Sequence, residues 1–360
     1  MFFDKIINAP NEIILNIEYL KKSEYPLILL GAGFYANEVR QLLLHHKIKI
    51  DHVVVDEKWY VSHSFFYDHP IERINDVLNY YPKINIIVAL DNYQAKIEEF
   101  SQNPIVARCI LFEIASFHFD FSDYYLVIKE HSTELENLYL QLADDYSRDI
   151  MVAFINAKIS RNPKSLICLN VKDEEMYYPE FFKLSDDEVF IDCGAFDGDS
   201  ILSFVNKTKG KYSKVYAFEP DKNNIEKLKE NTSQFKNIEI IKKGCFSSKT
   251  TLYFRDGEGL SSTFSNQGNV TIEVDTIDNV IPEKVTIIKM DIEGSELEAL
   301  KGAQKTICKN LPKLVICLYH KPDDLFTIPQ YISELSDSYN LYLRHYGLYS
   351  YDLVLYAIPK

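Results

Sequence analysis

The feature that most constrains the fold is a strand, glycine turn and helix pattern that occurs twice. The first copy is PLILLGAGFYANEVRQLLLHH at 26–46, and the second is EVFIDCGAFDGDSILSFVNK at 188–207. In each copy an apolar run ends at a glycine, and a run with helical spacing follows. Strands that alternate with helices indicate a parallel sheet covered by helices. We therefore expect two α/β domains of Rossmann-like plan.

The remaining patterns set the domain boundaries. Alternating strands and helices fill 1–120, which we expect to form an N-terminal Rossmann-like domain. Residues 121–185 carry apolar residues at helical spacing and are expected to be a helical linker of one or two helices. A second alternating series fills 186–360 and ends in a predicted hairpin, YNLYLRHY followed by YDLVLYAIP. At ~150 residues per domain, a chain of 360 residues suits two domains and a linker.

Charge and cysteine usage narrow the function. The formal net charge is −14, and an acidic surface repels phosphate backbones, so we expect no nucleic-acid partner. The six cysteines form no C-x-x-C pair, which indicates buried thiols in a reducing compartment. No apolar run reaches the ~18 residues of a membrane span. These features predict a cytoplasmic protein without a transmembrane segment.

The second glycine turn carries the strongest chemical signal. An apolar strand runs into Asp192, and Gly194 and Gly198 follow, where the backbone can approach a ligand closely. A dinucleotide site would place a pyrophosphate at the start of the next helix. Here Asp192, Asp197 and Asp199 crowd the turn and would repel it. Three carboxylates suit a cationic ligand, such as the sulfonium and amino group of S-adenosylmethionine, although Asp192 alone could be a helix cap.

The ends of the next two strands complete a nucleoside site. Glu219, followed by Pro220, ends the second strand, where an acid can accept hydrogen bonds from both ribose hydroxyls. Gly244 and Cys245 follow the third strand, the position beside the adenine in such sheets. The acid at the second strand also occurs in NAD sites, so only its combination with the acidic turn favours the methyl donor.

The fourth strand ends in a further group of acids. Asp291 falls at the carboxyl edge, where open α/β sheets bind ligands. Ser295 and Glu298 match the S-x-x-E spacing of a capping box, which predicts the start of a helix. Glu293 and Glu296 fit either the site or the surface.

These blocks resemble the FkbM family of S-adenosylmethionine-dependent methyltransferases over about residues 175–358. The resemblance rests on FIDCGAFDGDS, AFEP, IIKMDIEGSELEALKGA and LYHKPDDLFTIPQYI, followed by LYLRHY and LVLYAIP. It implies a Rossmann-like seven-stranded sheet with an antiparallel last strand. It also implies methyl transfer, commonly to hydroxyls of carbohydrates or natural products. Cys193 stands where the family usually has a small residue.

The expected donor site draws on all of these strand ends. Its residues are Asp192, Gly194, Ala195, Phe196, Gly198, Asp199, Glu219, Pro220, Gly244, Cys245 and Asp291.

A hydroxyl acceptor needs a proton acceptor nearby, and a positioned base contributes ~10²–10⁴-fold. His320 is the first candidate, because it follows an apolar strand that ends at the same edge and titrates near neutral pH. Asp291 is the alternative base. Glu293, Arg344 and His345 are expected to contact the acceptor. We expect no metal, since these residues lack tight ligand spacing.

The first glycine turn matches G-x-G-x-x-A, with Asp56 at the end of the next strand, which is the context of a dinucleotide fingerprint. The region resembles the N-terminal domain of some sugar-modifying enzymes, such as sugar acyltransferases with nucleotide-sugar substrates. By that resemblance Gly31, Gly33 and Asp56 hold a nucleotide-linked sugar or another phosphate-bearing acceptor. The alternative is a packing or oligomerisation domain that kept the turn for its geometry.

The leading hypothesis is an O-methyltransferase that acts on a carbohydrate, glycolipid or nucleotide-sugar hydroxyl. Two alternatives remain: an NAD(P)-dependent oxidoreductase that uses the first glycine turn, and a non-catalytic nucleotide-binding scaffold. The acceptor is a small molecule or a glycan, and the sequence leaves homo-oligomer formation open.

Overall fold

The structure, a computed structural model, describes residues 2–113, 124–167, 169, 176–254, 270–347 and 349–360. It divides into two compact units. The first comprises Met1–Glu130, Val152–Asn170 and Gly347–Tyr351, and the second His131–Met151, Val171–Tyr346 and Asp352–Lys360. The stretch 121–185, expected to be a linker, is thus shared between the two units.

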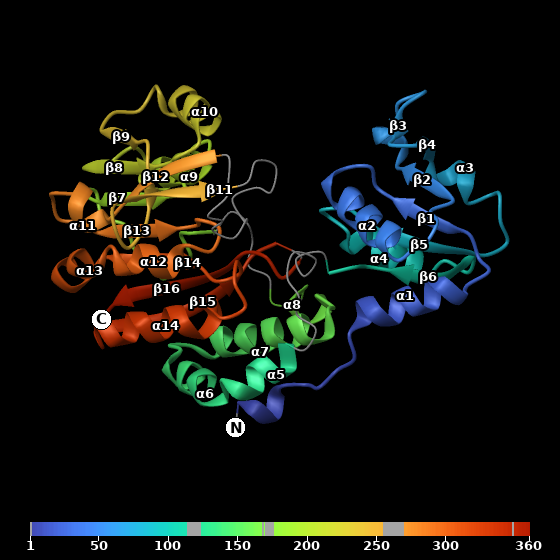
Figure 1. The fold of residues 1–360 in the computed structure, drawn as a ribbon, viewed down its shortest axis with the longest axis horizontal. Helices are drawn as coiled ribbons and strands as arrows, with labels where there is room; N and C mark the ends of the chain where they lie inside the picture. Colours follow the sequence, from blue (N-terminus) through green and yellow to red (C-terminus); the bar gives the residue numbers. More distant parts are fainter. Residues whose placement is uncertain (1, 114–123, 168, 170–175, 255–269, 348) are drawn as a thin grey trace. The chain divides into compact units, whose positions relative to one another are not determined.

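The first unit contains the first glycine turn (Figure 1). Its elements are η1 Phe3–Lys5, α1 Glu12–Lys22, β1 Leu27–Leu30, α2 Phe34–His45, β2 His52–Val55, η2 Glu57–Trp59, β3 Phe65–Phe66, β4 His69–Arg73, α3 Ile74–Val77, β5 Ile84–Val88, α4 Gln94–Ser101, β6 Val106–Ile110, α5 Tyr124–Glu130 and α8 Lys164–Ile167. Helix α7, Asp145–Ser160, begins in the second unit and ends in the first.

In its described residues the first unit has a six-stranded sheet in the order β3-β4-β2-β1-β5-β6. The strands from β4 to β6 are parallel, and only β3 is antiparallel to its neighbour β4. Strands β1 and β5 are buried along their whole length, as apolar runs in a parallel sheet covered on both faces should be. The predicted parallel sheet is confirmed, while the β3–β4 hairpin at its edge was not predicted.

The second unit contains the second glycine turn. Its elements are α6 Ser132–Gln141, β7 Val189–Cys193, α9 Asp199–Lys207, β8 Lys214–Phe218, α10 Lys222–Thr232, β9 Ile238–Ile241, β10 Gly244–Cys245, β11 Thr250–Phe254, β12 Val270–Asp275, α11 Ile277–Val280, β13 Ile287–Met290, α12 Glu296–Lys301, α13 Gln304–Asn310, β14 Lys313–Cys317, α14 Asp324–Leu335, β15 Tyr339–His345 and β16 Leu353–Pro359.

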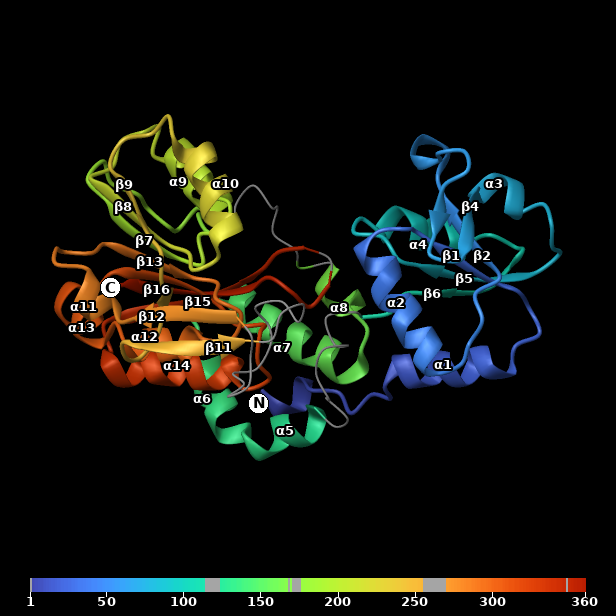
Figure 2. The ribbon, with the colours of Figure 1, turned by 45° about the horizontal axis from the view of Figure 1, so that its top comes forward.

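Over the part of this unit that the structure describes, seven strands form the sheet β15-β16-β14-β13-β7-β8-β9. Strand β16 is antiparallel to both β14 and β15, and the other neighbouring pairs are parallel. The expected seven-stranded sheet and its terminal hairpin are therefore present. Helices α9 and α10 lie on one side of this sheet and α12–α14 on the other (Figure 2).

Two local expectations were wrong. The run 295–310 was expected as one helix but is interrupted between α12 and α13 at Gly302, where an added Cβ would lie 2.0 Å from the Phe246 carbonyl oxygen. Ser295 precedes α12 but makes no capping hydrogen bond through its side chain. Glu298 instead accepts hydrogen bonds from Ser247 and Lys301, so the capping box does not form.

A small second sheet was also not predicted. In the described residues it has the strand order β10-β12-β11, with β11 antiparallel to β12. The polar loop RDGEGLSSTFSNQG lies outside the described residues. Among the helices that the structure describes, none is long and apolar enough to cross a bilayer.

Candidate active site

The carboxyl edge of the seven-stranded sheet gathers most of the predicted site residues. Strand β7 lies between β8 and β13, and all three are parallel, so their carboxyl ends meet at one edge. Asp192 is the penultimate residue of β7, Glu219 follows β8 and Asp291 follows β13. His320 follows the next strand, β14. Open α/β sheets bind their ligands at this edge.

The turn at 192–199, called the donor turn because the methyl donor is expected there, has the tight geometry that its glycines predict. Gly194 has a φ of +82°, and a Cβ added there would lie 2.0 Å from the carbonyl oxygen of Asp291. Gly198, with a φ of +95°, precedes α9. Phe196 between them also has a positive φ, of 46°, which is uncommon for a bulky residue and marks a conformation held by its surroundings. The turn is therefore fixed before any ligand binds.

Glu219 is held by the same turn. Its Oε2 accepts the Phe196 N–H at 2.9 Å, and its Oε1 accepts the Asp221 N–H at 2.9 Å. Burial raises the pKa of this carboxyl group, against the lowering effect of these N–H donors. Oε2 keeps a further acceptor position, and Oε1 also accepts a long hydrogen bond from the Asn224 side chain, at 3.5 Å, which a ligand hydroxyl can replace. Glu219 can thus take up two hydroxyl hydrogen bonds, the pattern that a ribose requires, and Pro220 fixes the chain directly after it.

Asp192 does not face a ligand in the way we expected. It is fully buried, accepts a hydrogen bond from Ser200 and forms an ion pair with Lys289, with 3.0 Å between Oδ1 and Nζ. Lys289 also donates to the Gly194 carbonyl oxygen at 3.1 Å. Burial would lower the pKa of Lys289, but Asp192 and Asp291 raise it above its ordinary value. The charge of Asp192 is therefore balanced, and of the other carboxylates of this turn Asp199 is exposed and Asp197 half-buried.

Lys289 was missed in the sequence, although a signal was present. It is the only charge in the apolar strand run VTIIKM. A lysine in a buried strand is rarely left unpaired, and the register places Lys289 beside Asp192 on the neighbouring strand. The pair fixes β7 to β13 beneath the donor turn.

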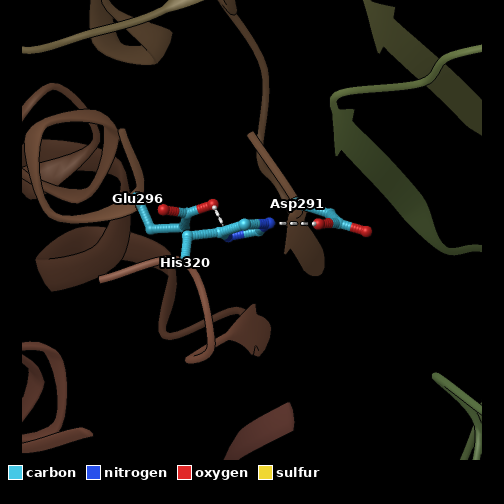
Figure 3. A group of neighbouring side chains, drawn as sticks. All are labelled: Asp291, Glu296 and His320. Carbon is cyan, nitrogen blue, oxygen red and sulfur yellow. Dashed lines mark ion pairs between the residues drawn. The ribbon is translucent and has the colours of Figure 1, made fainter. Parts of the chain in front are cut away.

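His320 lies between carboxylates (Figure 3). Its Nδ1 is 2.9 Å from Glu296 Oε1, and its Nε2 is 3.4 Å from Asp291 Oδ1 and 3.5 Å from Glu293 Oε2. Burial would lower the pKa of the imidazole, but Glu296 and the other two acids raise it to about 9. The ring is therefore cationic at neutral pH. An imidazolium has no free lone pair, so His320 is not a ready base, contrary to our first choice.

The same three groups also form a candidate cation cluster. Asp291, Glu296 and His320 each offer a ligand atom within 4.8 Å of the others. In Figure 3 the imidazole lies between the two carboxylates, with one nitrogen toward each. In this arrangement the ring itself supplies the positive charge, so the geometry favours an ion triad over a metal site.

Two tyrosines hold Asp291 from the other side. The Tyr319 hydroxyl donates to Oδ1 at 3.0 Å and the Tyr177 hydroxyl to Oδ2 at 3.4 Å. Burial would raise the pKa of Asp291, but Lys289 and His320 lower it below its ordinary value. Tyr177 has a φ of +67°, and its N–H donates to the Tyr356 hydroxyl at 3.1 Å. Asp291 is therefore an oriented carboxylate, and nothing in the sequence near Tyr177 signalled this contact.

Glu293 and Asp324 complete the acidic surroundings of His320. The Glu293 side chain is 41% exposed, so it can meet an acceptor from solvent, and its φ of +55° places it in the left-handed region. Asp324 is buried, and burial together with Glu296 raises its pKa to about 8. The carboxyl groups of Asp291, Glu293, Glu296 and Asp324 thus surround the imidazole of His320.

Arg344 and His345 are not placed to hold an acceptor. The Arg344 guanidinium donates to Asp144 at 2.7 Å and to Ser147 at 2.9 Å, and it lies over the Phe181 ring. His345 is fully buried. Both were expected to contact the acceptor, but Arg344 is held by Asp144 and Ser147, and both side chains are buried. They contribute to the fold of the second unit.

Gly244 and Cys245 form strand β10, which pairs with β12. The Cys245 sulfur lies 3.0 Å from that of Cys193, at the end of β7. Ala195, in the donor turn, donates its N–H to the Phe218 carbonyl oxygen at 3.0 Å. The structure thus brings the residues expected at the adenine next to the donor turn.

The first unit repeats the turn but not its chemistry. Gly31 has a φ of +125°, and an added Cβ would lie 2.3 Å from the Ala89 carbonyl oxygen, whereas Gly33 has free space around it. Asp56 forms an ion pair with Lys96 at 2.7 Å. The Tyr349 ring stacks on Tyr35, with 5.1 Å between the ring centroids. The acid expected at a ribose is therefore already paired with a cation.

The strand order of the seven-stranded sheet and the acids at its carboxyl edge define a methyltransferase fold of the class I type. Residues 192–347 match the family model described as the methyltransferase FkbM domain. Residues 192–347 of the second unit are thus similar to the FkbM methyltransferase domain, the family that the sequence blocks indicated.

A solved structure shares the fold. A methyltransferase FkbM from Methylobacillus flagellatus KT superposes with a TM-score of 0.77 at 24% identity, covering 98% of this chain and 95% of that one. This likeness includes both units. An rRNA methylase from Streptococcus thermophilus matches with a TM-score of 0.34 at 17% identity, over 49% of this chain and 89% of its own. No curated protein matches this chain.

Proposed function

We propose that this chain transfers a methyl group from S-adenosylmethionine to a hydroxyl group of a carbohydrate, a glycolipid or a nucleotide sugar. The observation that carries the proposal is the FkbM domain together with the carboxylates at the edge of its sheet. When bound, S-adenosylmethionine supplies an electrophilic methyl group on a sulfonium.

The donor would lie along the carboxyl ends of β7, β8 and β10. Glu219 would receive the ribose hydroxyls, because both of its oxygens are fixed by backbone N–H groups. Oε2 keeps a free acceptor position, and at Oε1 a hydroxyl would replace the long contact with Asn224. Gly244 and Cys245 would border the adenine. Asp199 and the ionised Asp291 would face the positive charge of the amino group and sulfonium. The cationic ligand thereby meets carboxylates that are already oriented.

Asp291 is the group best placed to receive the acceptor hydroxyl. Its carboxylate is ionised, oriented by Tyr177 and Tyr319, and lies at the sheet edge beside the donor turn. As the new carbon–oxygen bond forms, the hydroxyl proton would pass to this carboxylate. His320 would hold Asp291 in place and balance its charge. Positioning and exclusion of water contribute most of the acceleration in such an in-line displacement.

Methyl transfer from labelled S-adenosylmethionine into cell-extract glycans and nucleotide sugars, followed by mass spectrometry, tests the activity. Asp291→Asn should lower kcat by ~10²-fold or more and lower S-adenosylhomocysteine affinity by a much smaller factor, because Asp199 still faces the amino group. If Asp291 accepts the proton, kcat of the wild type stays level between neutral pH and about pH 9. A kcat that rises through this range would return the role of base to His320. No methyl transfer to any hydroxyl would contradict the proposed substrate class.

The first unit is proposed to serve packing rather than nucleotide binding. Lys96 already pairs with Asp56, and Tyr349 stacks on the tyrosine that follows the glycine turn. A nucleotide-linked sugar at Gly31 and Gly33 remains the alternative. Loss of acceptor binding in Gly33→Asp, with donor binding retained, would support it.

A further inference from the structure

Two cysteines meet at the donor turn. Cys193 ends β7 and Cys245 ends β10, so they stand 52 residues apart in sequence. Their sulfur atoms are 3.0 Å apart, closer than two sulfur atoms in ordinary van der Waals contact. Both side chains are buried, with 0% and 3% of their surface exposed. Formation of a disulfide, at about 2.05 Å between the sulfurs, needs an approach of only about 1 Å.

Each cysteine belongs to an element that builds the donor site. The Cys193 carbonyl oxygen accepts the Asp291 N–H at 3.1 Å, and the next residue is Gly194. Cys245 follows Gly244, and the Phe246 N–H after it donates to the Asp275 carbonyl oxygen at 2.9 Å. A bond between the two sulfurs would therefore join the donor turn to the strand expected beside the adenine.

We propose that Cys193 and Cys245 form a redox-active dithiol, and that its oxidation to a disulfide weakens binding of the methyl donor. The effect on the donor rests on the proposed function, whereas the disulfide itself does not. The backbone at Gly194 lies close against the end of β13, where an added Cβ would be 2.0 Å from the Asp291 carbonyl oxygen. Drawing Cys193 toward β10 must therefore alter the turn.

The oxidation is balanced with a peroxide as oxidant. One thiolate attacks hydrogen peroxide and becomes a sulfenic acid, with release of hydroxide. The second thiol then displaces water from the sulfenic acid and forms the disulfide. Overall, two thiols and one peroxide give a disulfide and two waters. Burial raises the pKa of Cys245, so the thiolate forms mainly when the edge opens, and a bound donor analogue should slow the reaction.

Peroxide treatment of the full-length chain tests the proposal. Cys308 is exposed, so the background variant Cys308→Ser removes a competing thiol. Non-reducing peptide mapping by mass spectrometry should find a Cys193–Cys245 link that a reductant removes. Calorimetry should show about tenfold weaker binding of S-adenosylhomocysteine to the oxidised protein, within the usual range of coupling between sites.

Cys245→Ala and Cys193→Ala, each in the Cys308→Ser background, are the matched controls. Both should form no link and keep their affinity after peroxide. Absence of the link in the parent protein, or a link that leaves affinity unchanged, would overturn the proposal. If the reduced protein fails to bind S-adenosylhomocysteine at all, the proposed function fails, and the mapping still reports on the dithiol.

Discussion

The two glycine turns of this chain share the close approach of their first glycine to a neighbouring strand and differ in the charged groups around them. At Gly31 and at Gly194 a Cβ would collide with a carbonyl oxygen at the end of the neighbouring strand, at 2.3 Å and 2.0 Å respectively. Both glycines also have positive φ. The fold thus requires glycine at this point, whether or not a ligand binds there. A glycine motif alone therefore indicates a close approach between the turn and a neighbouring strand. The charges around the turn indicate the ligand.

Those charges differ between the units. Asp56 forms a half-exposed ion pair with Lys96, whereas Glu219 is buried and held by backbone N–H groups. Beneath the second turn lies the buried pair of Asp192 and Lys289. In the pair at the first turn, the side chains of Lys96 and Asp56 are 21% and 27% exposed. Of the two turns, only the second has both a buried ion pair beneath it and a strand-end acid, Glu219, that can still accept a hydrogen bond.

The largest expected effect comes from breaking the buried pair. Lys289→Met leaves Asp192 as an uncompensated buried charge, which costs about 3–5 kcal/mol of unfolding free energy. Lys96→Met breaks the half-exposed pair of the first unit and should cost about 1 kcal/mol or less. Urea denaturation of both variants measures the contrast. Equal losses would mean that the two turns rest on similar electrostatics.

The second effect is a pH dependence that originates at His320. Its pKa is raised from 6.5 to about 9 on folding, so its stabilising contribution is complete below about pH 6.5 and is lost as pH rises toward 9. The wild type should therefore lose up to about 3 kcal/mol of stability relative to His320→Gln across this range. Denaturation curves of both proteins at several pH values provide the test. A constant difference between them would remove the ion triad from the account.

The third effect separates the two strand-end acids. Glu219→Ala removes charged hydrogen-bond acceptors, each worth about 1.5–3 kcal/mol, so S-adenosylhomocysteine affinity should fall about tenfold or more. Asp56→Ala in the first unit should leave this affinity unchanged. Calorimetry with both variants makes the comparison, and circular dichroism checks that each is folded. A weaker donor affinity in Asp56→Ala would assign the donor to the first turn.

The smallest effect concerns metal removal. Because His320 supplies the positive charge between Asp291 and Glu296, treatment with EDTA should change methyl transfer by less than about twofold, close to the precision of a rate measurement. Activity lost with EDTA and restored by a divalent cation would show that the three groups bind metal instead.

The sequence predicted the parts of this molecule that depend on local pattern. Apolar periodicity located the strands of both large sheets except β3 and β4, and the acids of DCGAFDGD and AFEP were expected at one edge. What it could not provide were contacts made across the sheet. The Lys289 pair, the Tyr177 hydrogen bond to Asp291 and the burial of Arg344 each join residues far apart in sequence.

The charge state of His320 was missed for the same reason. A histidine suggests a base, because its ordinary pKa is near neutral. Glu296, however, lies six residues beyond the end of β13, and its burial beside the imidazole follows only from packing. The residue type therefore predicted a titrating group, while its neighbours decided which form it takes.

A crystal structure with S-adenosylhomocysteine tests the central claim most directly. We expect the nucleoside in the second unit, with its ribose hydroxyls on Glu219 and its amino acid portion beside the turn at 192–199. Density for the ligand beside Gly31 instead, with Glu219 free of it, would contradict the assignment.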